Sequence, residues 1–127
     1  MGGDSSKVFL GGWSRGGAIA LSTFLQIGKV PLGGVCCINS TFVTNIDWST
    51  VKSELKNMTP ISFLNSSKDE IHSKDEVTAS WFLLKQKGIN FDCKFIKEQD
   101  HSLCNESINN MIEFFASKMT KLPEKDA

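Results

Sequence analysis

A serine flanked by glycines is the residue of this sequence best suited to covalent chemistry. It lies in the run Gly12-Trp13-Ser14-Arg15-Gly16-Gly17, which has the spacing G-x-S-x-G. In that spacing the serine occupies a strained turn between a strand and a helix, and the flanking glycines let the backbone approach itself without a Cβ clash. The hydroxyl then stands above the strand ends, beside the positive end of the helix dipole. The sequence therefore predicts Ser14 as a nucleophile for acyl transfer.

A serine hydroxyl is a weak nucleophile, so it needs a general base and an acid that orients the base. Of the two histidines, His101 follows the fourth expected strand and His72 follows the third. Asp69 lies in the polar loop after that third strand. The order Ser14, Asp69, His101 is the chain order serine, acid, histidine that accompanies such a turn. We therefore predict Asp69 as the acid and His101 as the base.

Other residues offer alternatives for the acid and the base. Asp75 and Asp100 are candidate acids, although Asp100 adjoins His101 in the chain and is awkwardly placed to reach the inner ring nitrogen. Asp69 could instead be an ordinary turn aspartate, and His101 a solvated loop histidine. We expect His72 to lie on the surface or on the rim of the pocket, and not to act as the base.

Apolar patterns predict the elements that must position these residues. Continuous apolar runs are typical of buried parallel strands, whereas the alternation in residues 91–96 indicates an edge strand with one face in water. In that strand we expect Phe91, Cys93 and Phe95 to face the core. Helical spacing and stop signals mark the helices. The expected strands are 7–10, 33–38, 60–64 and 91–96, and the expected helices are 15–27, 75–87 and a last one capped by Asn105 or Ser107.

The second and the last helix carry apolar stripes, whereas the segment at residues 40–58 has no regular pattern. The second helix has the apolar set Val77, Ala79, Trp81, Phe82 and Leu84, and the last has Ile108, Met111, Ile112, Phe115 and Met119. Residues 40–58 are expected to form loop, with a short helix at 49–57. Their apolar residues, Phe42, Val43, Ile46 and Trp48, either line the wall of an acyl site or simply cover the core.

Strands and helices alternate along the chain, which predicts an α/β fold with three layers: a mostly parallel sheet of about four strands, flanked by helices. Residues 1–120 are expected to form one domain and residues 121–127 a polar tail that frays. Active sites of open α/β sheets collect at the carboxyl ends of the strands. Ser14, Asp69 and His101 all follow such ends, so they are expected to meet there.

Composition limits the other function classes. Lysine plus arginine (14) balances aspartate plus glutamate (14), so no strong field attracts nucleic acid or an anionic membrane. No run reaches the roughly 20 apolar residues of a membrane span, and the N-terminus lacks signal-peptide features. The four cysteines lack zinc-site spacing and are expected to be reduced thiols of a cytoplasmic protein. The glycine run lacks the lysine–Ser/Thr ending of a P-loop and the G-x-G-x-x-G spacing of a dinucleotide-binding turn.

The runs at residues 8–18 and 99–102, Val-Phe-Leu-Gly-Gly-Trp-Ser-Arg-Gly-Gly-Ala and Gln-Asp-His-Ser, resemble acyl-protein thioesterases and their carboxylesterase relatives. The resemblance extends over nearly the whole chain. It implies an α/β-hydrolase fold and hydrolysis of thioesters and esters, including palmitoyl-cysteine on proteins and lysophospholipids. No metal or organic cofactor is then expected, because the chemistry is acyl transfer through a serine ester.

The resemblance also implies residue roles. Ser14 would be the nucleophile, Asp69 the acid and His101 the base, and the backbone N–H of Arg15 would be one oxyanion donor. The family usually has glutamine where this chain has Arg15, a change that keeps the backbone donor and alters the local charge. Its acid loop typically reads His-Gly-x-x-Asp and then an apolar residue and proline, unlike the loop at residues 65–73 here.

Such relatives carry about as many residues again before this segment, with four further strands and the loop of the second oxyanion donor. The resemblance therefore implies the C-terminal half of the fold, with an unpaired apolar edge at Val8-Leu10 that a partner chain or an N-terminal segment would cover. Loss of one oxyanion donor lowers the rate by ~10²–10³. Two functions follow: a serine hydrolase that is truncated or completed by another polypeptide, or a non-catalytic half-hydrolase that serves as a structural subunit.

Overall fold

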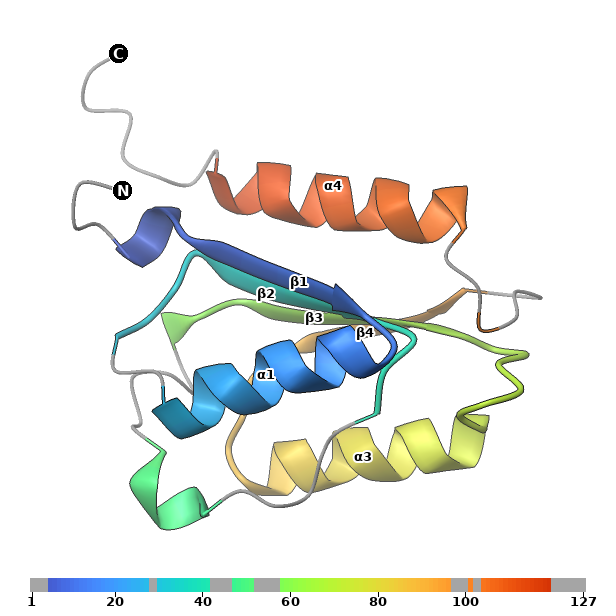
Figure 1. The fold of residues 1–127 in the computed structure, drawn as a ribbon, viewed down its shortest axis with the longest axis horizontal. Helices are drawn as coiled ribbons and strands as arrows, with labels where there is room; N and C mark the ends of the chain where they lie inside the picture. Colours follow the sequence, from blue (N-terminus) through green and yellow to red (C-terminus); the bar gives the residue numbers. More distant parts are fainter. Residues whose placement is uncertain are drawn as a thin grey trace.

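A computed structural model describes residues 5–27, 30–41, 47–51, 58–96, 101 and 104–119. Strands and helices alternate along these residues, as Figure 1 shows. The elements are the short 3₁₀ turn η1 (Ser5–Lys7), β1 (Phe9–Trp13), α1 (Arg15–Ile27), β2 (Gly34–Ile38), the 3₁₀ turn η2 (Trp48–Thr50), β3 (Ile61–Ser66), α3 (Lys74–Gln86), β4 (Asp92–Ile96) and α4 (Asn105–Met119).

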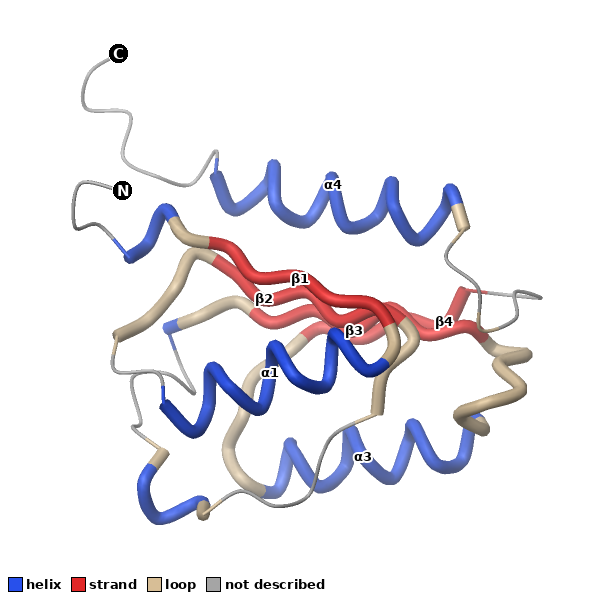
Figure 2. The backbone as a smooth tube through the Cα atoms, in the orientation of Figure 1, coloured by secondary structure: helices blue, strands red, loops and turns tan. Residues whose placement is uncertain are grey.

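The four strands form one parallel sheet in the order β1-β2-β3-β4. Helix α4 covers one face of this sheet, and α1 and α3 lie together on the other (Figures 1 and 2). Because every described strand runs in the same direction, all the carboxyl ends reach the same edge of the sheet. The predicted three-layer α/β fold with a four-stranded parallel sheet is confirmed.

The core has two parts, one on each face of the sheet. Val35, Cys37 and Phe63 belong to the cluster under α1 and α3, whereas Cys36 and Ile38 belong to the cluster under α4. Successive side chains of β2 thus enter opposite layers, as the period of two in a strand requires. All four cysteines are free thiols, and burial raises the pKa of Cys36 to about 12.

The boundaries of two strands differ from the prediction by two or three residues. Lys7 belongs to η1, and β1 continues through Gly11 and Gly12 to Trp13, whereas the sequence placed the end of the strand before the glycines. Strand β3 continues two residues past Leu64 to Ser66. In both strands the backbone pairs with a neighbour along this extension, and ladder hydrogen bonds override the weak strand propensity of glycine and serine.

Both outer strands are less buried than the sequence suggested. Strand β1 was expected to be buried, but its residues are half-buried or exposed because the strand ends the sheet. The edge position of β4 is confirmed, and Phe91 and Phe95 pack against the core. Cys93, expected to face the core between them, is exposed. A strand with one neighbour leaves a small side chain uncovered.

The helices form as predicted, but parts of their apolar stripes face solvent. In α3, Val77, Trp81 and Leu84 are buried, while Phe82 is 63% exposed and Ala79 is exposed. In α4, Ile112 and Met119 are exposed, at 55% and 52%. Each helix contacts the sheet along one line, so only residues on that line are covered.

The segment after β2 is described in part. Residues 48–50 form η2 in place of the start of the expected helix at 49–57, and residues 52–57 lie outside the described part, as do Phe42, Val43 and Ile46. Trp48 packs against the core cluster below α1 and α3. Of the helices described, none is both long and apolar enough to cross a membrane.

Candidate active site

Ser14 lies in the turn between β1 and α1, as the glycine spacing predicted. Its φ of 57° is in the left-handed region, which costs a residue with a side chain about 1–3 kcal/mol. Two hydrogen bonds hold this backbone: the Ser14 N–H donates to the Ile38 carbonyl at 2.7 Å, and the Ser40 hydroxyl donates to the Ser14 carbonyl at 2.7 Å. The end of β2 therefore holds the turn in its strained conformation.

Only one glycine of the G-x-S-x-G pair is required by close approach. A Cβ on Gly12 would lie 2.3 Å from the Gly16 carbonyl carbon, which backbone atoms cannot relieve. A Cβ on Gly16 would meet nothing within 4 Å, contrary to the expectation that both flanking glycines avoid a clash. Instead it is the next residue, Gly17, that is crowded, by the Ser40 side chain. The reason is that Gly16 faces outward in the first turn of α1, where it is exposed.

A chain of two short hydrogen bonds joins the three predicted residues. The Ser14 Oγ lies 2.6 Å from the His101 Nε2, and the His101 Nδ1 lies 2.7 Å from the Asp69 Oδ2. The Asp69 side chain is 0% exposed and the His101 side chain is 13% exposed. With Nδ1 protonated and donating to the carboxylate, Nε2 is free to accept the serine proton, which is the tautomer that a general base needs.

Asp69 is held as a carboxylate by several donors. Its Oδ1 accepts hydrogen bonds from the backbone N–H groups of Ile71, at 2.7 Å, and His72, at 3.0 Å. Burial by itself raises the pKa of Asp69, but the hydrogen bond from His101, the two backbone donors and the charge of His101 outweigh burial and leave this pKa below its usual range. The site therefore keeps Asp69 ionised beside the imidazole.

Two of the three alternative residues lie in the described part of the chain. His72 lies beside His101, with ring centroids 5.5 Å apart, and its Nδ1 lies 3.4 Å from the Glu76 carboxylate. It lines a hollow next to Ser14 and so matches the expected rim position. Asp75 is exposed in the first turn of α3, and Asp100 lies outside the described residues.

The hollow next to Ser14 has a volume of about 250 Å³. Arg15 opens α1 on its border, and the N–H groups of the first helical turn have no acceptor within the helix. An oxyanion that forms at the substrate carbonyl would thus meet the N-terminal end of a helix. The hollow is lined by Ser14, Arg15, Ala18, Thr41, Ile71 and His72.

Three further residues contact the site, and no motif in the sequence predicted a role for them there. Ser40 bonds the Ser14 carbonyl, as described above. Trp13 donates from its Nε1 to the His101 carbonyl at 3.0 Å, and Asn39 donates from its Nδ2 to the same carbonyl at 2.9 Å. The position of Asn39 and Ser40 directly after a buried strand was a usable signal, because polar residues at carboxyl ends of parallel strands border the site.

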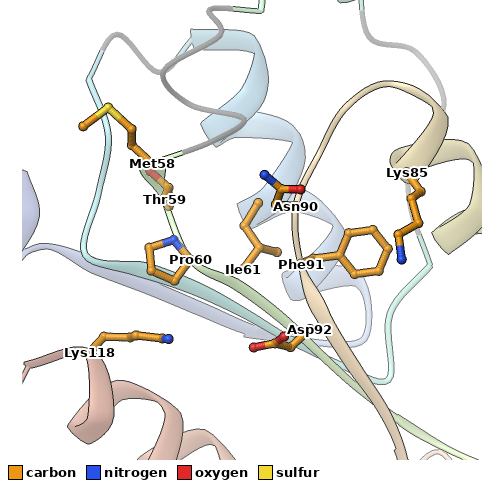
Figure 3. Close-up of a pocket in the computed structure, with 9 residues that line it drawn as sticks. All are labelled: Met58, Thr59, Pro60, Ile61, Lys85, Asn90, Phe91, Asp92 and Lys118. Atoms are coloured by element: carbon orange, nitrogen blue, oxygen red, sulfur yellow. The ribbon is translucent and has the colours of Figure 1, made fainter. Parts of the chain in front are cut away.

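A second hollow lies away from Ser14. It has a volume of about 340 Å³ and is built around the starts of β3 and β4 (Figure 3). Ser14 follows the carboxyl end of β1, so it lies at the opposite edge of this parallel sheet. Lys85, Asp92 and Lys118 are its charged residues. It contains no pairing of a nucleophile with a base among the side chains drawn. Over the described residues, no group of three or more His, Cys, Asp or Glu is arranged to hold a metal ion.

Comparison with known proteins agrees with this fold. The sequence model of the phospholipase/carboxylesterase family matches residues 1–119. The chain therefore belongs to this family of α/β-hydrolases. The predicted family and fold are thereby confirmed.

Individual relatives agree with this assignment. The chain is 25% identical over 123 residues to acyl-protein thioesterase 1 of Neurospora crassa, with 95% of this chain and 50% of the relative covered. It is 26% identical over 117 residues to acyl-protein thioesterase 1 homolog 1 of Dictyostelium discoideum, covering 92% and 51%. The chain thus spans about half the length of the curated relatives it matches.

Solved structures show the same partial match. The crystal structure of Arabidopsis thaliana SOBER1 superposes with a TM-score of 0.83 at 25% identity, over 93% of this chain and 56% of that one. The Bacillus cereus carboxylesterase superposes with a TM-score of 0.70 at 16% identity, over 91% of this chain and 51% of that one. At this identity the match shows a shared fold alone.

Proposed function

We propose that the protein is a serine hydrolase that cleaves carboxylic esters or thioesters, with Ser14 as nucleophile, His101 as base and Asp69 as acid. The observation that carries this proposal is the pair of short hydrogen bonds, 2.6 Å from Ser14 to His101 and 2.7 Å from His101 to Asp69. Three residues far apart in the chain meet in the geometry that acyl transfer needs. Membership of the phospholipase/carboxylesterase family supports the same chemistry.

The proposed reaction has two stages, the acylation of Ser14 and its deacylation by water. The Ser14 Oγ attacks the carbonyl carbon while its proton moves to the His101 Nε2, and ionised Asp69 stabilises the imidazolium. The oxyanion forms near the backbone N–H of Arg15, and the alcohol or thiol leaves with the proton from His101. A water then gives its proton to His101 and attacks the acyl-serine, which releases the carboxylic acid and restores Ser14.

The proposed substrates are acyl esters or thioesters, lipidated proteins among them. The printed names of the Neurospora and Dictyostelium relatives, acyl-protein thioesterases, support this choice. Ala18 and Ile71 provide apolar lining in the hollow next to Ser14, which suits an acyl chain. Because the chain spans about half of those relatives, further substrate contacts are proposed to come from outside these 127 residues.

Labelling with a fluorophosphonate probe tests this function, because the probe reacts with an activated serine. Ser14→Ala is expected to abolish labelling and turnover of a p-nitrophenyl ester. Ser117→Ala, in the exposed part of α4, is the matched control and should keep both. A folded chain that takes up no probe, alone or with a partner bound, would contradict the proposal and favour the role of a structural subunit.

We also propose that a polypeptide strand from outside these 127 residues pairs with the free edge of β1. Strand β1 ends the sheet, its Trp13 is 43% exposed, and a hollow of about 250 Å³ on the α4 side lies beside it. In the chain alone, the β1 amides that do not bond to β2 are expected to exchange quickly with solvent, and the chain to self-associate in sedimentation velocity. A stable monomer at high concentration would count against this partner.

A further inference from the structure

The backbone carbonyl of His101 is held as closely as its ring. It accepts two hydrogen bonds, from the Trp13 Nε1 at 3.0 Å and from the Asn39 Nδ2 at 2.9 Å. Trp13 ends β1 and Asn39 directly follows β2, so the donors come from two neighbouring strand ends. The Trp13 ring also lies against the imidazole, with centroids 5.4 Å apart.

Asn39 is held by hydrogen bonds of both its backbone and its side chain. It is 0% exposed, and its φ of 51° is in the left-handed region, which asparagine tolerates better than most residues. Its N–H donates to the Leu64 carbonyl at 2.8 Å, and its Oδ1 accepts from the Ser66 N–H at 2.8 Å. The amide therefore connects β3, on one side, to the carbonyl of His101 on the other.

We propose that Asn39 and Trp13 are positioning residues that fix His101, so that its imidazole stays between Ser14 and Asp69. With the carbonyl tied to β1 and β2 and the ring tied to Asp69 after β3, both ends of the histidine are held. Both residues act through His101, because their donors bond its backbone carbonyl. The consequence for rate rests on the proposed hydrolase function, because a displacement of about 1 Å at a reacting group can cost about 10²-fold.

A purely structural role for Asn39 leads to a different expectation. If its amide only satisfied buried polar groups at the ends of β2 and β3, its loss would lower the unfolding midpoint and leave the His101 ring unchanged. A positioning role requires that the ring itself respond. Spectroscopy of the imidazole separates the two roles, and stability alone does not.

Two variants remove one donor each. Asn39→Asp keeps the acceptor for Ser66 and a residue that tolerates positive φ, but it loses the donor to His101. Trp13→Phe keeps an aromatic ring and loses the indole N–H. The second variant lies at a partly exposed position, so it decides the question even where the buried carboxylate of the first prevents folding.

The controls repeat the same substitutions away from the site. Asn110→Asp changes an asparagine in α4 that bonds Lys94 and the Glu106 carbonyl. Trp81→Phe removes a buried indole N–H that has no hydrogen-bond partner among the described residues. Both controls are expected to leave His101 as it is in the wild-type chain.

The readouts are the ¹⁵N signals of the imidazoles and the rate of fluorophosphonate labelling. The sequence has two histidines, so His72→Gln assigns the His101 signals. The wild-type chain and both controls should show one neutral tautomer, with the proton on Nδ1. Asn39→Asp and Trp13→Phe are expected to shift the signals toward an average of two tautomers and to slow labelling about tenfold.

Each outcome decides one question. Wild-type imidazole signals in both site variants, with or without a change in unfolding midpoint, would overturn the positioning role. A folded wild-type chain that takes up no probe, alone or with a partner bound, would refute the proposed hydrolase function. The imidazole spectra would still decide whether Asn39 and Trp13 hold His101, because they need no turnover.

Discussion

Asp69 allows the most selective test at the scale of single residues. Asparagine has the same shape, but its amide would face the His101 Nδ1 and favour the wrong tautomer, so Asp69→Asn is expected to lower kcat by roughly 10⁴-fold. The measurement is steady-state hydrolysis of a p-nitrophenyl ester. Asp75→Asn is the matched control, since Asp75 was the other candidate acid and is exposed in the first turn of α3. A larger loss for Asp75→Asn would refute the assignment of the acid.

The roles of single residues depend on contacts between distant parts of the chain. Ser14 and His101 are 87 residues apart and His101 and Asp69 are 32 apart, yet the order serine, acid, histidine selected all three as candidates, and their side chains are in contact. The position of Asn39 after a strand end indicates only that it borders the site and not what it does there, because an asparagine after a strand is also common in turns. Its partner His101 lies 62 residues away. Sequence spacing therefore predicts catalytic candidates better than the residues that hold them.

The turn between β1 and α1 yields a prediction at the scale of an element. Gly12→Ala is expected to destabilise the turn and abolish probe labelling, because its Cβ would meet the Gly16 backbone at 2.3 Å. Gly16→Ala should label normally and, as alanine favours helix, should leave stability unchanged or raised. Labelling rate and urea unfolding measure both effects. Equal damage from the two substitutions would show that the turn is not held as described.

Helix α3 carries one apolar residue that is buried and one that is exposed, so it tests which property determines stability. Leu84 is 0% exposed, so Leu84→Ala is expected to lower the free energy of unfolding by about 2–5 kcal/mol. Phe82, in the same helix, is 63% exposed, and Phe82→Ala should change it by less than about 0.5 kcal/mol. Urea unfolding followed by circular dichroism gives both values. A comparable loss from Phe82→Ala would mean that a further surface covers this residue.

The whole molecule should lose stability in acid partly through one carboxylate. The pKa of Asp69 is lower in the folded chain than its ordinary value of about 3.9. Its ionised form therefore stabilises the fold fully above that value, and the contribution is lost as the pH falls through the lower folded pKa. The free energy of unfolding of Asp69→Asn is expected to fall less steeply below pH ~4 than that of the wild type. Parallel curves would contradict this linkage.

Local patterns in the sequence determined the strands and helices, the type of sheet and the turn at Ser14. The period of apolar residues specified strands and helices, their alternation specified a parallel α/β sheet, and the glycine spacing placed Ser14 in a strand-to-helix turn. These features are local because they depend on residues a few positions apart and on steric rules of the backbone. Strand ends were less well predicted, since β1 continues through Gly11 and Gly12 by pairing with β2.

Tertiary structure decided what local patterns left open. It placed Asp69 in contact with His101 and left Asp75 in solvent, and it turned Phe82 outward while burying Leu84. It also brought Asn39 and Trp13 to one carbonyl. The physical reason is the same in each case. Burial and hydrogen bonding depend on which elements pack together, and residues distant in the chain become neighbours only when the layers close around the sheet.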